Sequence, residues 1–245
     1  MYKLSRLAAA LVLSTAALPV VAQAESAWSV SGIIGVASDY TWHGVSQTQE
    51  DPTWQLEANL DHESGFYVGG QFWGVDFVPP GEDWDDGIRY ESNLYVGWSH
   101  ELSDFLSLTL DYTRTFYPGS RPDYDQDFNE FTVELGLGEN YTATVAWSDD
   151  AVNLGHEGLY LALAGNWDLG DSGFQLGAAA GRYDLGSELG GAYNDYELSL
   201  ARSFGPVATK LAYVTTSGYN DTLAESLGER HLASGRAVLS VGYEF

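Results

Sequence analysis

Twelve amphipathic segments, separated by gaps that are alternately short and long, constrain this fold more than any other feature of the sequence. Each segment is about as long as the 9–11 residues that cross a bilayer as a tilted strand, or slightly longer. The segments cover residues 28–38, 53–62, 66–77, 89–101, 105–117, 127–138, 141–148, 157–168, 173–184, 193–203, 206–216 and 231–245. A membrane barrel with both termini on one side needs an even strand number. The sequence therefore predicts an all-β fold: a transmembrane antiparallel β-barrel of about twelve strands, with both termini in the periplasm.

The gaps between the segments agree with this topology. Tight turns are expected on the periplasmic side of such a barrel and longer loops outside. The short gaps are rich in Gly, Asn, Asp and Ser, which close hairpins, and they cover residues 63–65, 102–104, 139–140, 169–172 and 204–205. The longer, polar gaps cover residues 39–52, 78–88, 118–126, 149–156, 185–192 and 217–230. We expect the long gaps to be extracellular loops without helices.

Apolar and polar residues alternate within the segments. Residues 105–117 place leucines such as Leu108 and Leu110 on one face, and Thr109 and Asp111 on the other. This period alone is also typical of a soluble β-sandwich or lipocalin-like barrel, with inside and outside exchanged. Three observations favour the membrane barrel: the alternating gaps, the aromatic residues near the segment ends, and the last segment.

Aromatic residues gather near both ends of the segments, as in the two interfacial girdles of membrane barrels. At the periplasmic ends we place Trp28, Phe66, Trp98, Phe105, Tyr141, Trp167, Phe174 and Phe204. At or near the other ends we place Trp54, Phe77, Tyr90, Phe116, Trp147, Tyr160 and Tyr183. The last segment alternates apolar residues up to the chain end, so we interpret Tyr243 and Phe245 as the assembly signal of an outer-membrane barrel.

The first 24 residues have the features of an export signal. Lys3 and Arg6 precede an apolar run over residues 7–21, and Ala-Gln-Ala at 22–24 is a small-x-small cleavage site. A short transmembrane anchor is the alternative, but this run is too short to span comfortably. We therefore assign residues 1–24 to a cleaved signal peptide and residues 25–245 to the barrel, located in the bacterial outer membrane.

Composition excludes several classes of function. The sequence contains no cysteine, so disulfides and thiolate metal sites are excluded. Without the leader, eight basic and 35 acidic residues remain, and the formal charge is −27. Nucleic acid is a poor partner for such a surface. The expected partners are outer-membrane lipid, the barrel-assembly machinery and small solutes.

Residues 38–48 read Ser-Asp-Tyr-Thr-Trp-His-Gly-Val-Ser-Gln-Thr, the most specific segment of the chain. Pro52, a Ser-Gly-Phe-Tyr at 64–67, a Val-Asp-Phe at 75–77 and a Tyr-Pro-Gly at 117–119 follow. Together these motifs resemble the Gcw_chp family, exported proteobacterial proteins of unknown function that are also described as TorF-like porin candidates. The resemblance covers the whole mature chain and implies a porin-like barrel. The family's usual arginine is replaced by His43, so an anion-binding role of that arginine does not carry over.

Charged residues at mid-strand are predicted to line the lumen. These lumen residues are Glu57, Glu91, Asp111, Glu130, Glu134, Asp195, Glu197, Lys210 and Arg236. The excess of acids predicts a lining that prefers cations. Small inward residues such as Gly97, Gly177 and Ala179 favour an open water path. The alternative is that hydrogen-bonded polar side chains fill the barrel. A barrel of twelve strands lies between eight-stranded barrels, which side chains fill, and sixteen-stranded barrels, which are open.

The first long gap has two interpretations. Its candidate residues are Ser38, Asp39, Tyr40, His43, Gly44, Ser46 and Gln47. They form either a functional loop or a loop that folds inward and braces the barrel. Asp39, Ser46 and Gln47 readily form hydrogen bonds within loops, and Gly44 permits a tight bend, which favours the bracing role.

Other candidate sites are weaker. The acidic stretches at 83–87 and 123–127 offer oxygen ligands for Ca²⁺, but position six of an EF-hand count is Phe128 instead of glycine, which favours ordinary solvated acids. His62 and Ser64 are close in sequence, yet they fall at a periplasmic turn, where catalysis is not expected. We predict no catalytic residue, no metal site and no cofactor.

The sequence therefore predicts a narrow, cation-preferring diffusion channel for small solutes. The alternative is a non-conducting surface barrel whose acidic extracellular loops bind a partner or divalent cations. An enzyme embedded in the barrel is the third hypothesis. The sequence does not identify the solute or the oligomeric state.

Overall fold

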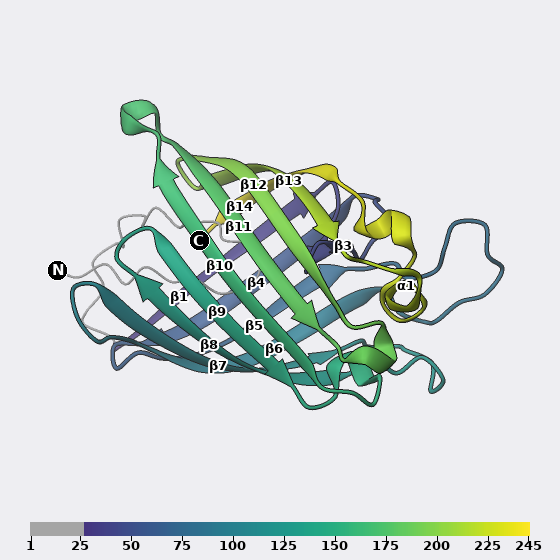
Figure 1. Ribbon diagram of the computed structural model, residues 1–245. Coiled ribbons are helices and arrows are strands. Elements are labelled where there is room, and N and C mark those ends of the chain that lie inside the picture. Colours follow the sequence, from purple (N-terminus) through teal and green to yellow (C-terminus); the bar gives the residue numbers. More distant parts are fainter. Residues whose placement is uncertain (1–26) are drawn as a thin grey trace.

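The computed structural model describes residues 27–245, whose strands close into one barrel (Figure 1). Each barrel strand pairs antiparallel with both neighbours, and β14 closes the ring against β1. The barrel strands are β1 Trp28–Ala37, β4 Thr53–His62, β5 Phe66–Gly74, β6 Tyr90–Glu101, β7 Leu106–Phe116, β8 Phe128–Leu137, β9 Tyr141–Ser148, β10 Gly158–Asp168, β11 Phe174–Asp184, β12 Ala192–Phe204, β13 Val207–Ser217 and β14 Arg236–Glu244. The predicted closed antiparallel barrel of twelve strands is confirmed. The proposed signal peptide lies outside the described residues.

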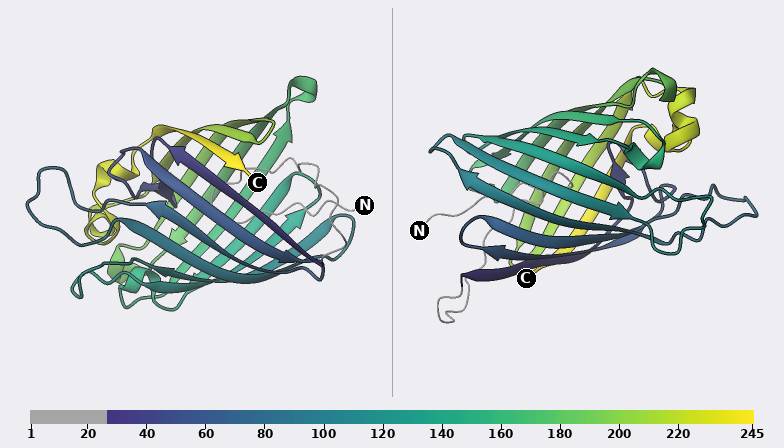
Figure 2. Two further views of the ribbon diagram at one scale, coloured as in Figure 1. Left: turned by 180° about the vertical axis from the view of Figure 1, so that it is seen from behind. Right: turned by 90° about the horizontal axis from the view of Figure 1, so that it is seen from below.

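Short turns and long loops gather at opposite ends of the barrel (Figure 2). We call these the short-turn end and the long-loop end. β1 begins and β14 ends at the short-turn end, where Phe245 exchanges two backbone hydrogen bonds of 3.0 Å with Gly32. The described residues contain no helix that is long and apolar enough to cross a membrane.

The loop between β13 and β14 differs from the sequence prediction. It contains a helix, α1 Asp221–Leu227, so the expectation of loops without helices is wrong here. The Asn220 side chain caps this helix by accepting a hydrogen bond from the Leu223 N–H. A 3₁₀ turn at Arg230–Ala233 follows, and for this reason β14 begins at Arg236 instead of residue 231. Further 3₁₀ turns are Ala151–Asn153, Gly170–Ser172 and Ser187–Leu189.

The outer face of the barrel is apolar. Exposed aliphatic side chains such as Ile34, Leu94 and Leu163 alternate with inward polar residues, which is the reverse of a water-soluble barrel. Large aromatic residues are exposed at the short-turn end, including Trp28, Phe66, Phe105, Tyr141, Phe204, Tyr243 and Phe245. Trp54 and Trp147 are exposed toward the other end.

Three residues predicted for the second girdle lie inside instead. Tyr183 is 1% exposed, and its ring packs edge-on against Tyr160, its cross-strand partner. Phe77 packs edge-on against the buried Tyr117. The reason is parity: Tyr183 is two residues from the inward Gly181, so it must share that face.

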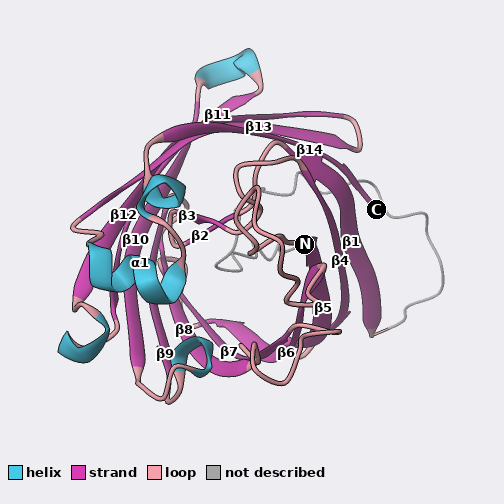
Figure 3. Ribbon diagram, turned by 90° about the vertical axis from the view of Figure 1, so that its right-hand side faces the viewer, coloured by secondary structure: helices cyan, strands magenta, loops and turns pink. Residues whose placement is uncertain are grey.

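The interior is not empty. The segment between β1 and β4 folds into the ring of strands and forms a small hairpin from β2 Thr41–Trp42 and β3 Val45–Ser46 (Figure 3). We call residues 38–52 the inner loop. This loop and the charged side chains around it make up the candidate site.

Candidate functional site

The tip of the inner loop is a two-residue turn. Trp42 pairs with Val45, and the intervening His43 and Gly44 have φ values of 47° and 79°. Positive φ at both positions is what a tight hairpin turn of this kind requires, and glycine adopts it without strain. A Cβ atom on Gly44 would lie 2.8 Å from Thr216 and 2.9 Å from Asp195. The tip therefore presses against the wall formed by β12 and β13.

The base of the inner loop is held by Asp39. Its Oδ1 accepts hydrogen bonds from the hydroxyls of Ser46 (2.6 Å) and Thr48 (2.7 Å). Its Oδ2 forms a 3.0 Å ion pair with Arg236 of β14, and both side chains are largely buried. Arg236 also lies 3.5 Å from the carboxylate of Glu50. One arginine thus closes the loop and ties it to the last strand.

Tyr40 fixes the loop to β5 and β6, across the ring from the wall that the loop tip contacts. Its ring stacks on Trp73 of β5, with a centroid distance of 4.4 Å and an interplanar angle of 8°. Its hydroxyl donates to Glu91 of β6 at 2.9 Å, and Tyr117 and Asn93 donate to the same carboxylate. Burial and the neighbouring Glu91 raise the pKa values of Tyr40 and Tyr117 well above the ordinary value. Because β5 and β6 lie across the ring from β12 and β13, the inner loop spans the lumen.

His43 is enclosed by aromatic rings. Its ring centroid lies 3.8 Å from that of Tyr160, 4.7 Å from that of Tyr183 and 4.3 Å from that of Trp42. Its Nε2 atom is buried and has no hydrogen-bond partner within residues 27–245. Burial lowers the pKa of His43 to about 3, so the imidazole is neutral at pH 7. Any electrostatic influence of the loop tip therefore comes from its neighbours.

All nine predicted lumen residues lie on the strand face opposite the exposed apolar residues. Lys210 forms a 2.7 Å ion pair with Glu197, and Arg236 pairs with Asp39. Both basic lumen residues are therefore neutralised. Ion pairs to a described residue are absent for Glu57, Glu91, Asp111, Glu130, Glu134 and Asp195.

The unpaired carboxylates are hydrogen-bonded by neutral groups. Tyr67 and Thr113 donate to Asp111 at 3.0 and 2.7 Å, and Thr144 donates to Glu134 at 3.3 Å. Register brings three of these acids together. Thr132, the cross-strand partner of Asp111, lies between Glu130 and Glu134 on one face of β8.

Sequence reasoning missed several interior residues. Asp61 and Glu244 also face inward near the short-turn end, and both share strand parity with predicted lumen residues. Trp73 and Tyr117, which complete the anchor of Tyr40, are separated from it by 33 or more positions in the sequence. No local pattern connects such distant partners. In contrast, period two along β4 and β14 is sufficient to find Asp61 and Glu244.

The other candidate groups make ordinary local contacts. Asp85 pairs with Arg89 at 3.0 Å, and the Gly87 N–H and Arg89 lower its pKa. Asp127 pairs with Arg114 at 3.0 Å. Within residues 27–245 no group of three or more acidic or histidine side chains could hold a metal ion.

His62 and Ser64 do meet at the short-turn end. The Nδ1 atom of His62 lies 2.7 Å from the Ser64 hydroxyl, but both residues are at the surface of a turn. The Ser64 N–H also donates to this Nδ1 at 3.2 Å, and the imidazole packs against the Trp28 ring at 4.6 Å between centroids. A histidine that activates a nucleophile needs a group that orients it, and no carboxylate hydrogen bond to His62 occurs within the described residues.

A vestibule lies above the inner loop at the long-loop end. This cavity of about 170 Å³ is lined by aromatic residues from several loops: Trp42, Phe77, Trp84, Tyr117, Tyr124 and Tyr193. Its polar lining includes Ser46, Gln47, Gln49, Asp86 and Gln126. Trp84 and Tyr124, from two different loops, stack at 5.1 Å between centroids. None of the described residues that line it is Lys, Arg or His.

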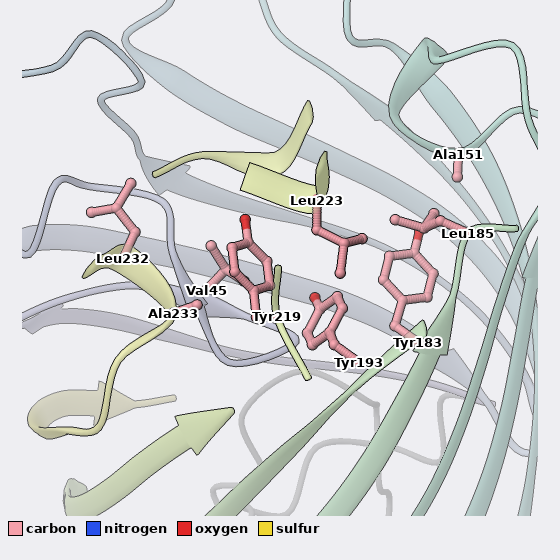
Figure 4. Close-up of a cluster of buried hydrophobic side chains, with 9 residues drawn as sticks. All are labelled: Val45, Ala151, Tyr183, Leu185, Tyr193, Tyr219, Leu223, Leu232 and Ala233. Carbon is pink, nitrogen blue, oxygen red and sulfur yellow. The ribbon is translucent and has the colours of Figure 1, made fainter. Parts of the chain in front are cut away.

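An apolar cap covers part of the same end. Leu223 of α1 and Leu232 pack with Val45 of the inner loop and with Tyr193 and Tyr219 (Figure 4). Leu223 and Tyr193 are fully buried. The cap therefore holds the inner loop from above, while Asp39 and Tyr40 hold it from the sides.

A family model described as a bacterial protein of unknown function (Gcw_chp) matches residues 21–245. The chain belongs to the Gcw_chp family. No curated protein matches it. The motif at residues 38–48, which carries the family resemblance, lies within the inner loop of this Gcw_chp barrel.

Among solved structures, the Gcw_chp barrel is similar to that of the KdgM porin, with a TM-score of 0.55 and 6% identity over 88% of this chain and 99% of that one. A structure of KdgM porin in complex with disordered oligogalacturonate gives a TM-score of 0.54 and 7% identity, over 89% and 99%. LpxR from Salmonella typhimurium is less similar, at 0.48 and 11% identity over 88% and 99%. At these identities the likeness to KdgM shows a shared outer-membrane barrel fold.

Proposed function

We propose that this protein is an outer-membrane channel through which small solutes diffuse, and that its narrow lumen prefers cations. The observation that carries this proposal is the uncompensated charge of the interior. Asp111, Glu130 and Glu134 lie close together on adjacent strands, whereas both interior basic groups are paired. Acidic side chains that line a confined water path attract cations.

The inner loop supports the narrow part of the proposal. It crosses the lumen and is held on three sides, so a permeating solute must pass beside it. Polar side chains on both the loop and the wall would replace the water that a small ion or solute leaves behind. Large solutes are expected to be excluded.

The charge also separates this chain from KdgM, whose structure contains an oligogalacturonate, a polyanion. A mature chain with a formal charge of −27 and acidic walls repels such a ligand. We therefore infer that the fold is shared and that the solute is different.

The test is a planar-bilayer measurement on the purified barrel. Discrete channels with a cation-selective reversal potential in a KCl gradient are expected. Selectivity should weaken but persist as salt approaches 1 M, where the screening length falls to about 3 Å. Anion selectivity would contradict the proposal, and so would the absence of any conductance.

We also propose that the long-loop end faces the cell exterior, because tight turns of such barrels lie in the periplasm. Epitopes inserted at Asp85 or Asn220 should bind antibody on intact cells, whereas epitopes at Ser64 or Ser172 should not. Labelling at both sets of positions would overturn this topology. The assembly machinery would then engage Tyr243 and Phe245 from the periplasm, after removal of residues 1–24.

One observation favours a second function. The inner loop and the apolar cap occupy much of the long-loop end, with Val45, Tyr193 and Leu223 fully buried. A barrel closed in this way could act through its loops alone, binding a partner or divalent cations. A barrel that inserts correctly, carries no current and binds through its loops would support this alternative.

A further inference from the structure

Two residues that line the vestibule at the long-loop end, Asp86 and Gln49, carry hydrogen-bond acceptors that the described chain leaves unused. Asp86 is 1% exposed; its Oδ1 accepts from the Ile88 N–H at 2.8 Å, and its Oδ2 has no hydrogen-bond partner within residues 27–245. The Oε1 atom of Gln49, on the inner loop, is likewise buried without a partner. Buried polar atoms of this kind call for a donor from a ligand or from water.

The charge around Asp86 is only partly balanced. Arg89 is its nearest basic group, at 3.7 Å from Oδ1, and this guanidinium is shared with Asp85 at 3.0 Å. Arg121 directs its guanidinium to the Asp85 carbonyl and to Asp123. Burial raises the pKa of Asp86, partly opposed by the Ile88 N–H. A cation in the vestibule would stabilise the ionised carboxylate.

The rest of the lining suits a cation that has an apolar body. Aromatic faces carry negative potential, and a cation above them gains from about 0.5 kcal/mol at exposed sites to about 2 kcal/mol when desolvated. Trp84 is 37% exposed and stacks on Tyr124, so this part of the aromatic lining reaches solvent. The volume of about 170 Å³ is close to that of a cavity of about 150 Å³ that accommodates benzene.

We propose that the vestibule is a binding site for small organic ammonium ions, in which Asp86 and Gln49 accept the N–H groups and the aromatic rings cover the apolar body. A neutral sugar is the less suitable occupant, because it brings no charge to balance the buried Asp86 carboxylate. If this ammonium ion is also the transported solute, the inference rests on the proposed channel function. The binding of the ion to the vestibule does not depend on that function.

The experiment is calorimetric titration of the folded, detergent-solubilised barrel at constant ionic strength. The probes are cyclohexylammonium chloride, its neutral counterpart cyclohexanol, and D-glucose. The ammonium ion should bind at least tenfold more tightly than cyclohexanol, which corresponds to about 1.4 kcal/mol. Equal affinity for the two, or tighter binding of glucose, would overturn the proposal using the unmodified protein alone.

Two variants locate the site. Asp86→Asn retains an acceptor for the Ile88 N–H and removes the charge, so ammonium affinity should fall about tenfold while cyclohexanol affinity changes less than twofold. Trp84→Leu keeps an apolar side chain and should weaken ammonium binding about three- to tenfold. Asp171→Asn, in the exposed turn at the short-turn end, is the matched control and should have no effect. Unchanged ammonium affinity in Asp86→Asn would remove the site from the vestibule.

Failure of this proposal and failure of channel function can be told apart. Ammonium binding without conductance would leave the site in place and overturn the channel. Conductance without ammonium binding would retain the channel and overturn the site.

Discussion

The two sides of the lumen hold their carboxylates in different ways. On the wall formed by β4 to β8, the donors are neutral: Tyr67 and Thr113 for Asp111, and Tyr40 and Tyr117 for Glu91. On the wall formed by β12 to β14, the donors are cations. Lys210 pairs with Glu197, and Arg236 pairs with Asp39. Asp195 and Glu244 are exceptions on that side. The Tyr160 hydroxyl donates to Asp195, and Glu244 forms no ion pair with a described residue.

This difference separates two tasks. A neutral donor leaves a carboxylate without a counter-charge, so under the proposed channel function we expect the β4–β8 wall to set the electric field of the lumen. An ion pair cancels the charge and leaves a strong, directional link, so the β12–β14 wall anchors the inner loop. Substitutions on the first wall should therefore change selectivity, and substitutions on the second wall should change stability.

The largest effect is expected for Arg236→Met. The substitution leaves Asp39, which is 4% exposed, without its counter-charge, and breaking such a pair from one side costs about 3–5 kcal/mol. The midpoint of urea unfolding in detergent should fall accordingly. If the channel conducts, its single-channel conductance should rise because the inner loop loses its anchor on β14.

Two controls accompany this substitution. Arg202 lies on the outer face, 4.8 Å above the Phe174 and Phe204 rings, and Arg202→Met should cost about 0.5–1 kcal/mol. Asp39→Asn combined with Arg236→Met removes the unpaired charge of Asp39 and should recover part of the lost free energy of unfolding. Equal effects of the two single arginine substitutions would show that Arg236 is not an anchor.

The next effect concerns pH and the loop tip. His43 has a pKa of about 3 in the folded barrel and an ordinary value of about 6.5 when unfolded. Below pH 6.5 the unfolded chain therefore binds a proton that the folded barrel does not. The contribution of His43 to the free energy of unfolding therefore has its full value above pH 6.5. It is lost as the pH falls toward 3, by up to about 1.4 kcal/mol per pH unit.

His43→Phe removes this contribution and retains an aromatic ring beside Tyr160. Unfolding midpoints measured between pH 7 and pH 4 should decline less steeply for the variant than for the unmodified barrel. The acid sensitivity that remains in both proteins belongs to the carboxylates. Parallel pH profiles would show that the imidazole binds its proton at the same pH in the folded barrel as in the unfolded chain.

The fold could be predicted almost completely because its signal is local. Period two within each strand, together with alternating gap lengths, predicts the β4 and β9 boundaries without error. The predicted start of β14 at residue 231 is wrong because nothing local shows that Arg230–Ala233 make a 3₁₀ turn.

The site could be predicted only in part, for a physical reason. Parity fixes which side chains face inward, but not which of them meet. Asp39 and Arg236 are 197 positions apart, and their pairing depends on ring closure. Parity also places Tyr183 inward, because it shares the face of Gly181, so the sequence itself argues against its place in the outer girdle. The inward fold of the inner loop depends on contacts with distant strands, which no local pattern contains.

A smaller effect is expected for Tyr40→Phe on the anchor that uses neutral donors. The hydroxyl donates to Glu91 at 2.9 Å, but Tyr117 and Asn93 continue to satisfy that carboxylate. The loss should be about 1–2 kcal/mol in the free energy of unfolding, clearly below that of Arg236→Met. Tyr243→Phe, at an exposed position on the outer face, is the control and should change it by less than about 0.5 kcal/mol.

The smallest effect in energy is the one that tests the field of the β4–β8 wall. Glu130→Gln with Glu134→Gln removes two charges that flank the cross-strand partner of Asp111. The cation-to-anion permeability ratio should fall about threefold, equivalent to about 0.7 kcal/mol, and the reversal potential should move toward zero. Lys210→Met with Glu197→Gln deletes one charge of each sign from the other wall and should leave the ratio unchanged. The second pair of substitutions could shift the reversal potential as much as the first pair. The paired charges would then contribute to the electric field of the lumen as strongly as the unpaired ones. That result would contradict the difference between the two walls.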